Sequence, residues 1–185
     1  MKGLEMSSPF VNTHRDVTYV PRPVALHSHT YVEILFCRNP AGVEYLVGPD
    51  RYKLQRGDVV LIPPGISHRP ILPEHLPEPY VRDVLWINTD FLSTVMKTFP
   101  KATDDGQAHM SLIRTAGTSW AFLGELFQTG VMEEEQKKTG WEAVVAGNTL
   151  KILAYLDRAR DDRTAGNPRA EKPELLDKVT AYIEE

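Results

Sequence analysis

The sequence HSHTYVE, residues 27–33, decides how this chain folds. His27, His29 and Glu33 all fall on odd-numbered positions within it. Because successive side chains of a β-strand point to opposite faces, a strand over residues 25–37 places these three on one face. The sequence therefore predicts a strand that carries two imidazoles and a carboxylate on the same side.

A second stretch, GDVVLIPPGISH at residues 57–68, adds one more imidazole. Its order predicts a turn at Gly57, a buried strand over residues 58–62 and a second turn ending at His68. Four side chains then form a predicted metal site: His27, His29, Glu33 and His68. Such a set suits a divalent transition metal such as Zn, Ni, Fe or Mn, with coordination positions left open. A hydrogen-bonded polar lining without a metal is the alternative, and no organic cofactor is expected.

Composition places the chain among ordinary globular proteins. Its 185 residues fit one domain, or one domain with a small appendage, and 42% of them are hydrophobic. The net charge of −4 and the lack of a basic stripe argue against direct binding of a phosphate backbone by this part of the protein. The single cysteine, Cys37, can form no internal disulfide, which suits a reducing compartment. No apolar run reaches the ~18 residues of a membrane span, so we expect a cytoplasmic protein without a membrane partner.

Short strands separated by turn residues recur through the first half of the chain. Residues 1–16 are polar and lack periodicity, which predicts an N-terminal arm, and residues 17–23 predict a short first strand interrupted by prolines. Further strands are expected at residues 43–47, 52–54 and 80–87. Residues 69–79 hold four prolines and are expected to form an extended loop without ladder pairing. This rhythm is typical of a β-sandwich or β-barrel.

The strand predicted over residues 80–87 supplies further candidate binding residues. Arg82 and Trp86 share its even-numbered face, and a cation beside an aromatic ring is typical of a pocket wall. Tyr31 lies among the predicted ligands of the first motif. An effector inside the barrel would therefore contact Tyr31, Arg82 and Trp86 together with the four predicted metal ligands. A surface strand with one exposed Trp is the alternative.

The second half of the chain is predicted to be helical. A short helix over residues 90–98 follows the last strand, and apolar residues recur at helical spacing over residues 118–138. A further helix over residues 139–160 is expected to open with a capping box formed by Thr139 and Glu142.

The helix over residues 139–160 carries an apolar face that Asn148 interrupts. We expect this face to form a homodimer interface, whose predicted members are Val144, Asn148, Ile152 and Tyr155. An Asn in an apolar seam costs stability, but it can pair with its symmetry mate and set the register of a helical dimer. The alternative is that the Asn148 amide bonds a carbonyl of its own subunit.

The last residues have the composition of a linker followed by a new element. Residues 161–172 are polar and contain Gly and Pro, as linkers do. Residues 173–185 predict an amphipathic helix with Pro173 at its start. A linker followed by one opening helix indicates the beginning of a truncated further domain.

The two motifs resemble those of the cupin family. As spacing they read H-x-H-x-x-x-E and G-x-x-x-x-x-P-x-G-x-x-H, and the likeness covers roughly residues 20–90. Leu72 stands where the cupin motif ends in Asn. The resemblance implies a mainly β fold with appended α-helices, in which a cupin-like double-stranded β-helix barrel at residues 17–100 precedes two long α-helices.

The order of the whole chain resembles the amino-terminal half of AraC-family transcription regulators. The stretches that carry this likeness are HSHTYVEILF, GDVVLIPPGISHR, VLWINTDFL and PELLDKVTAYIEE. The resemblance implies a barrel that binds a small effector such as a sugar, and a helical dimerisation segment over residues 101–160. It also implies DNA binding through a helix-turn-helix domain that residues 173–185 begin. The implied protein is not an enzyme; a metal-dependent cupin dioxygenase, isomerase or decarboxylase is the alternative, because open coordination positions permit Lewis-acid chemistry.

Overall fold

The computed structural model describes residues 5–99 and 112–162. Within these ranges eight strands and three helices follow one another. The strands are β1 (Val11–Thr18), β2 (Val32–Asn39), β3 (Glu44–Val47), β4 (Asp50–Lys53), β5 (Asp58–Ile62), β6 (His68–Ile71), β7 (Tyr80–Ile87) and β8 (Leu112–Arg114). The helices are α1 (Thr89–Thr98), α2 (Leu123–Gln136) and α3 (Trp141–Asp161).

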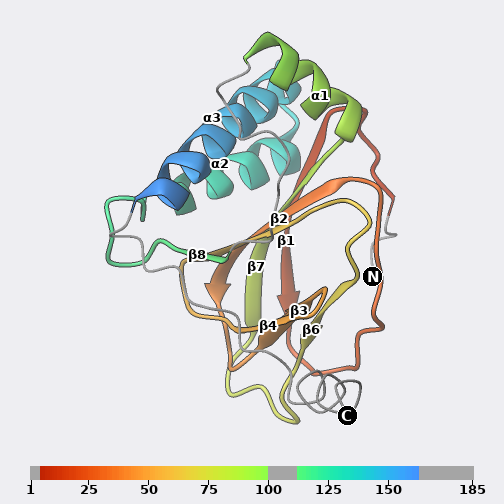
Figure 1. The fold of residues 1–185 in the computed structure, drawn as a ribbon, viewed down its shortest axis with the longest axis vertical. Coiled ribbons are helices and arrows are strands. Elements are labelled where there is room, and N and C mark those ends of the chain that lie inside the picture. The colour runs from red at the N-terminus through yellow and green to blue at the C-terminus, as the bar shows by residue number, and fades with distance from the viewer. Residues whose placement is uncertain (1–4, 100–111, 163–185) are drawn as a thin grey trace, which may run out of the picture.

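Three layers make up the body of the molecule (Figure 1). A five-stranded sheet in the order β1-β7-β2-β5-β8 lies in the middle, with α2 and α3 on one face. A three-stranded sheet, β4-β3-β6, packs on its other face. The mainly β fold with appended helices is therefore confirmed. Over the described ranges, however, the two sheets stay separate and do not close into the predicted barrel.

Strand β2 is buried on both faces, as its sequence predicts. Ile34 and Phe36 belong to the core beneath the helices, where the Phe36 ring stacks on Phe127 of α2 at a centroid distance of 5.3 Å. Leu35 and Cys37 belong to the core between the two sheets. Alternate side chains of one strand thus build two cores, and burial of each large apolar side chain contributes about 1.5–3 kcal/mol.

Strand β1 corrects the prediction for the N-terminus. It covers Val11–Thr18 and pairs antiparallel with β7, so the predicted arm over residues 1–16 was wrong from residue 11 onward, and the strand ends before most of residues 17–23. The polar side chains of β1 made the strand hard to recognise in the sequence. In the structure they find partners on other elements. Asn12, for example, donates from Nδ2 to Glu134 Oε1 of α2 at 3.0 Å.

The predicted ligand strand over residues 25–37 begins as a regular strand only at Val32. The preceding segment bonds to the first residue of β6 and to the turn before it, through an isolated bridge and not a regular ladder. His27 and His68 exchange backbone hydrogen bonds of 3.2 and 2.8 Å, and Gly65 N donates to His29 O at 2.8 Å. These bonds satisfy the backbone of the segment without a ladder.

Strand β6 corrects the prediction that residues 69–79 form an unpaired loop. It pairs with β3 and contains Pro70, which lies opposite Tyr45. β6 is an edge strand, and an edge strand needs ladder bonds on one side only. The missing N–H of proline is tolerated there.

Helices α2 and α3 begin later than their sequences predict, at Leu123 and Trp141, whereas α1 begins at Thr89, one residue before its predicted start. The Thr118 hydroxyl donates to Thr115 O at 2.7 Å and accepts from Trp120 N at 3.1 Å, which holds a turn in place of the first predicted helical turn. The capping box at Thr139 is absent from α3. Gly140 is the N-cap residue and makes no side-chain cap. Its φ of 81° lies in the left-handed region, which only glycine adopts without strain.

Three further observations complete the description of the fold. Strand β8 was not predicted, because three residues carry too little periodicity to be recognised. None of the helices in the described ranges is long and apolar enough to cross a membrane. The predicted linker over residues 161–172 starts one residue too early, because Asp161 still belongs to α3; its residues beyond Asp162 and the predicted final helix lie outside the described residues.

Asp58 begins β5 as a buried carboxyl group. Its Oδ2 accepts a hydrogen bond of 2.8 Å from Gln55 N, and its Oδ1 lies 3.6 Å from Arg114 Nε in β8. Burial raises the pKa of Asp58 to about 6, although the Gln55 N–H and the Arg114 charge act in the opposite direction.

We expect Asp58→Asn to stabilise the chain at neutral pH by about 1–2 kcal/mol. Because the folded-state pKa lies above the ordinary value of 3.8, ionisation of Asp58 costs folding stability. The cost is absent below about pH 4, grows as the pH rises, and is complete above about pH 6. Urea unfolding should therefore show a more stable variant at about pH 8 and equal stabilities at about pH 4. Equal stabilities at both pH values would contradict the expectation.

Candidate metal and ligand site

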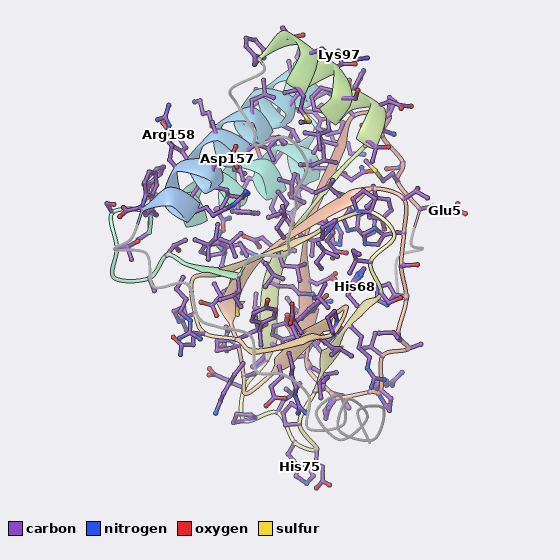
Figure 2. All side chains as sticks on the ribbon, in the orientation of Figure 1. Glu5, His68, His75, Lys97, Asp157 and Arg158 are labelled. Atoms are coloured by element: carbon purple, nitrogen blue, oxygen red, sulfur yellow. The ribbon has the colours of Figure 1, made fainter. Side chains whose placement is uncertain are left out.

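Three of the predicted ligands meet between the two sheets. His29 Nε2 lies 2.7 Å from Glu33 Oε2, and His68 Nε2 lies 3.2 Å from the same oxygen. One ligand atom from each side chain lies within 4.8 Å of the others. All three residues are buried, and Figure 2 shows His68 inside the sheet layers, far from Asp157 and Arg158 on α3.

Backbone carbonyls orient both imidazole rings. His29 Nδ1 donates to Tyr31 O at 2.9 Å, and His68 Nδ1 donates to Ile66 O at 2.8 Å. In a neutral ring with Nδ1–H, the Nε2 atom carries the lone pair that binds a metal. Both Nε2 atoms face Glu33, so the donor set fits a divalent transition metal held by two imidazoles and a carboxylate.

The electrostatics of the site keep Glu33 ionised. Burial raises the pKa of Glu33, but hydrogen bonds and charge from His29 and His68 more than offset it and bring the pKa to about 2. Burial lowers the pKa of His68, while its contact with Glu33 and its bond to Ile66 O leave the pKa raised overall. The carboxylate is therefore in the form that binds a cation at neutral pH.

His27 lies beside this cluster and not within it. Its ring centroid is 4.4 Å from that of His68 and 6.4 Å from that of His29. Its Nδ1 is 3.0 Å from Ala25 O, and the residue is partly exposed. The regular strand that would align His27 with Glu33 starts only at Val32. The role of His27 as a fourth ligand stays a prediction.

Aromatic side chains surround the cluster. Tyr31 stacks on His29 with ring centroids 3.8 Å apart, and Tyr31 and Trp86 lie 4.9 Å apart. In the sheet register Trp86 lies opposite Glu33, and Arg82 lies opposite Cys37, so both face the interior. The structure therefore brings the predicted binding residues to one side of the sheet, while their role in binding an effector stays a prediction.

Sequence reasoning missed three interior residues. Tyr45 of β3 has its ring 6.4 Å from His68, Tyr80 lies beneath the Arg82 guanidinium at 4.9 Å, and Asp16 Oδ2 accepts from Arg82 Nη2 at 2.8 Å. The even-numbered face of residues 80–87 already includes Tyr80, so parity could have found it. Asp16 and Tyr45 come from strands whose placement depends on tertiary pairing.

The predicted dimer residues have unequal exposure in α3. Val144 is 44% exposed, whereas Asn148 and Ile152 are buried. The Asn148 side chain donates from Nδ2 to the Leu126 carbonyl of α2. This is the bond within one subunit that was the alternative to pairing with a second Asn148 across a dimer. Tyr155 packs edge-on against Phe122 at 5.0 Å. The homodimer interface stays a prediction.

Comparisons place this fold among known structures. No protein-family model matches the sequence, and no curated protein matches it. The chain resembles ToxT from Vibrio cholerae strain SCE256, an AraC-family regulator, with a TM-score of 0.51 and 14% identity over 89% of this chain and 61% of ToxT. Salicylate 1,2-dioxygenase from Pseudoaminobacter salicylatoxidans matches at TM-score 0.38 and 22% identity, over 49% of this chain and 25% of that protein. A cupin 2 conserved barrel domain protein from Salinispora arenicola matches at TM-score 0.38 and 20% identity, over 53% of this chain and 79% of its own.

The likeness to ToxT concerns the fold. It confirms at that level the resemblance to an AraC-type regulator, because it extends over 89% of this chain and so includes both sheet and helices. The chain spans 61% of ToxT and 25% of the dioxygenase.

Proposed function

We propose that this chain is the effector-sensing and dimerisation part of an AraC-type DNA-binding transcription regulator. The regulator acts in the cytoplasm. It binds a small molecule between its two sheets. The observation that supports this function is the buried cluster of His29, Glu33 and His68 within an aromatic interior, in a chain that shares its fold with ToxT.

A purely structural core has little use for such a cluster. Burial of ionisable groups costs free energy, and apolar side chains of similar size would pack there at no electrostatic cost. Perturbed ionisable groups in an enclosed interior therefore indicate a binding site. The residues proposed to contact the effector are Tyr31, Arg82, Trp86, His27, His29, Glu33 and His68.

A divalent metal would be held by His29, Glu33 and His68, with His27 as the proposed fourth ligand. When bound, it would supply a positive charge and open positions for an oxygen or nitrogen of the effector. The carbonyls of Tyr31 and Ile66 keep the two Nε2 atoms directed at that position. The stacked ring of Tyr31 shields His29 from solvent.

Effector binding would have to reach DNA through other parts of the protein. We propose a homodimer through the helix at 139–160 and DNA recognition through a helix-turn-helix domain beyond this segment. An effector changes DNA binding only by preferring one arrangement of the protein, and such couplings amount to about 1–3 kcal/mol.

Chromatin immunoprecipitation with the protein encoded by the intact gene tests this function. We expect enrichment of discrete DNA sites, and a changed occupancy of those sites in the Glu33→Ala variant. Glu44→Ala, which removes an exposed partner of Arg51, is the matched control and should leave occupancy unchanged. Absence of enriched sites would refute the regulator.

A metal-dependent cupin enzyme is the second candidate, because the same donor set can bind a catalytic metal. Oxygen-uptake and product assays on metal-loaded protein would detect it. Turnover that is lost in Glu33→Ala, together with an absence of enriched DNA sites, would replace the regulator by the enzyme.

A further inference from the structure

The inner face of β7 carries hydrogen-bond donors that have no protein partner. Among the described residues, Tyr80 Oη, Arg82 Nη1 and Trp86 Nε1 are buried and find no acceptor. Tyr80 is 1% exposed and Trp86 is 8% exposed. All three lie outside the cluster of His29, Glu33 and His68, and side chains on one face of a strand repeat every second residue.

Such donors are expensive to bury. A buried donor without an acceptor costs about 1–3 kcal/mol, and nearly all such groups in folded proteins have a partner. Two of them, on Tyr80 and Arg82, are on neighbouring positions of this face and indicate an acceptor from outside the chain. The acceptor must supply lone pairs, because both groups donate.

The positive charge at this position is that of Arg82, which already has one carboxylate partner in Asp16. The Arg82 guanidinium lies 4.9 Å from the Tyr80 ring centroid and uses Nη2 to bind Asp16 at 2.8 Å, which leaves Nη1. Burial raises the pKa of Tyr80, although Arg82 acts to lower it, so its hydroxyl remains a neutral donor. Arg82 Nη1 and the Tyr80 hydroxyl are thus two buried donors without an acceptor on one strand face, and a carboxylate has oxygens that accept from such groups.

We propose that Arg82 and Tyr80 recognise a carboxylate on the effector, so that this chain senses a small organic acid with an apolar or aromatic body. The inference rests on the proposed effector-sensing function and names the chemical class of its ligand. The rings of Tyr31, Tyr45 and Trp86 provide the apolar wall for the body of that acid.

Asp16 acts as an internal competitor at this position. Its carboxylate is 41% exposed, while the Arg82 side chain is 17% exposed, so the pair lies toward the rim of the interior. A ligand carboxylate must share the guanidinium with Asp16 or displace it. Removal of the Asp16 charge should therefore strengthen acid binding.

Calorimetric titration of the intact protein with matched acid and amide pairs tests the proposal. The probes are benzoate, phenylacetate and hexanoate, each against its primary amide. We expect at least one acid to bind about tenfold more tightly than its amide, and Arg82→Gln to remove that preference. Tyr80→Phe should weaken binding of that acid by about threefold to tenfold, and Asp16→Asn should strengthen it. Arg51→Gln removes the same charge from the exposed ion pair with Glu44 and should change nothing.

Circular dichroism on each variant establishes that it is folded, and Tyr80→Phe and Asp16→Asn change single polar groups with little change of volume. The proposal is overturned if no acid binds better than its amide to either the parent or Asp16→Asn. It is also overturned if a folded Arg82→Gln keeps the preference for the acid. Binding of neutral sugars that depends on Glu33 and not on Arg82 would contradict the proposal of an acid ligand and leave the effector-sensing function in place. Acid binding by a protein that enriches no DNA site would contradict the regulator function and leave the acid ligand in place.

Discussion

Asp83→Ala is expected to destabilise the chain by about 3–5 kcal/mol, because it removes one side of a buried ion-pair network. Asp83 is fully buried on the helix-facing side of β7. Arg15 Nε of β1 donates to its Oδ1 at 2.6 Å, and Arg38 Nε of β2 donates to its Oδ2 at 2.7 Å. One carboxylate therefore holds two guanidinium groups from the strands on either side.

The same two arginines attach the sheet to α2. Arg15 also donates to the Gln128 side chain, and Arg38 to the Gly124 carbonyl. Their side chains are 31% and 26% exposed, so removal of Asp83 leaves two half-buried charges without their counterion. Strand pairing and helix docking should weaken together.

Urea unfolding followed by circular dichroism measures this loss. The matched control is Glu44→Ala, because the Arg51–Glu44 pair is exposed at 44% and 28% and should contribute no more than about 1 kcal/mol. The double variant Arg38→Ala/Asp83→Ala should lose less than the sum of its single variants, since the two side chains are in contact. A loss below about 1 kcal/mol for Asp83→Ala would show that the network contributes little to stability.

Alanine at His29, Glu33 or His68 is expected to abolish specific metal binding. Loss of an outer-shell partner alone commonly costs about 10–100-fold in metal affinity, and loss of a direct ligand should cost at least as much. Both imidazoles have Nδ1 bonded to a carbonyl and Nε2 directed at Glu33, so each of the three side chains supplies one donor atom of the described cluster.

His27→Ala is the comparison variant for this experiment, because it tests the proposed fourth ligand against the three that form the cluster. It removes an imidazole 4.4 Å from the His68 ring that lies outside the three-residue cluster. Elemental analysis and calorimetry with Zn²⁺ on metal-stripped protein measure the difference. We expect His27→Ala to weaken Zn²⁺ binding less than His68→Ala does. An equal loss would establish His27 as a full ligand, and unchanged binding in His68→Ala would refute the site.

Some features of this protein follow from sequence spacing alone. Short periods are local, so alternation within residues 32–37 predicted a strand buried on both faces, and both cores are present. The spacing of the two motifs, which resembles that of cupins, predicted that imidazoles and a carboxylate would meet, and His29, Glu33 and His68 do. Strand alternation operates over a few residues, which is why the sequence determined the burial of β2, whereas the meeting of residues 29–33 with residue 68 was predictable only through that resemblance.

Other features were decided by tertiary structure. Strand β1 is stabilised by partners on β7 and α2, and β6 accepts Pro70 only because it lies at a sheet edge. His27 lies beside the cluster, where its backbone pairs with the distant residue His68. Which strands become neighbours decides that Asp16 and Tyr80 contact Arg82. It also decides that the two sheets stay separate over the described residues. Strand pairing over long sequence distances depends on the burial and hydrogen bonding of whole elements. These contributions cannot be read from a short stretch of sequence.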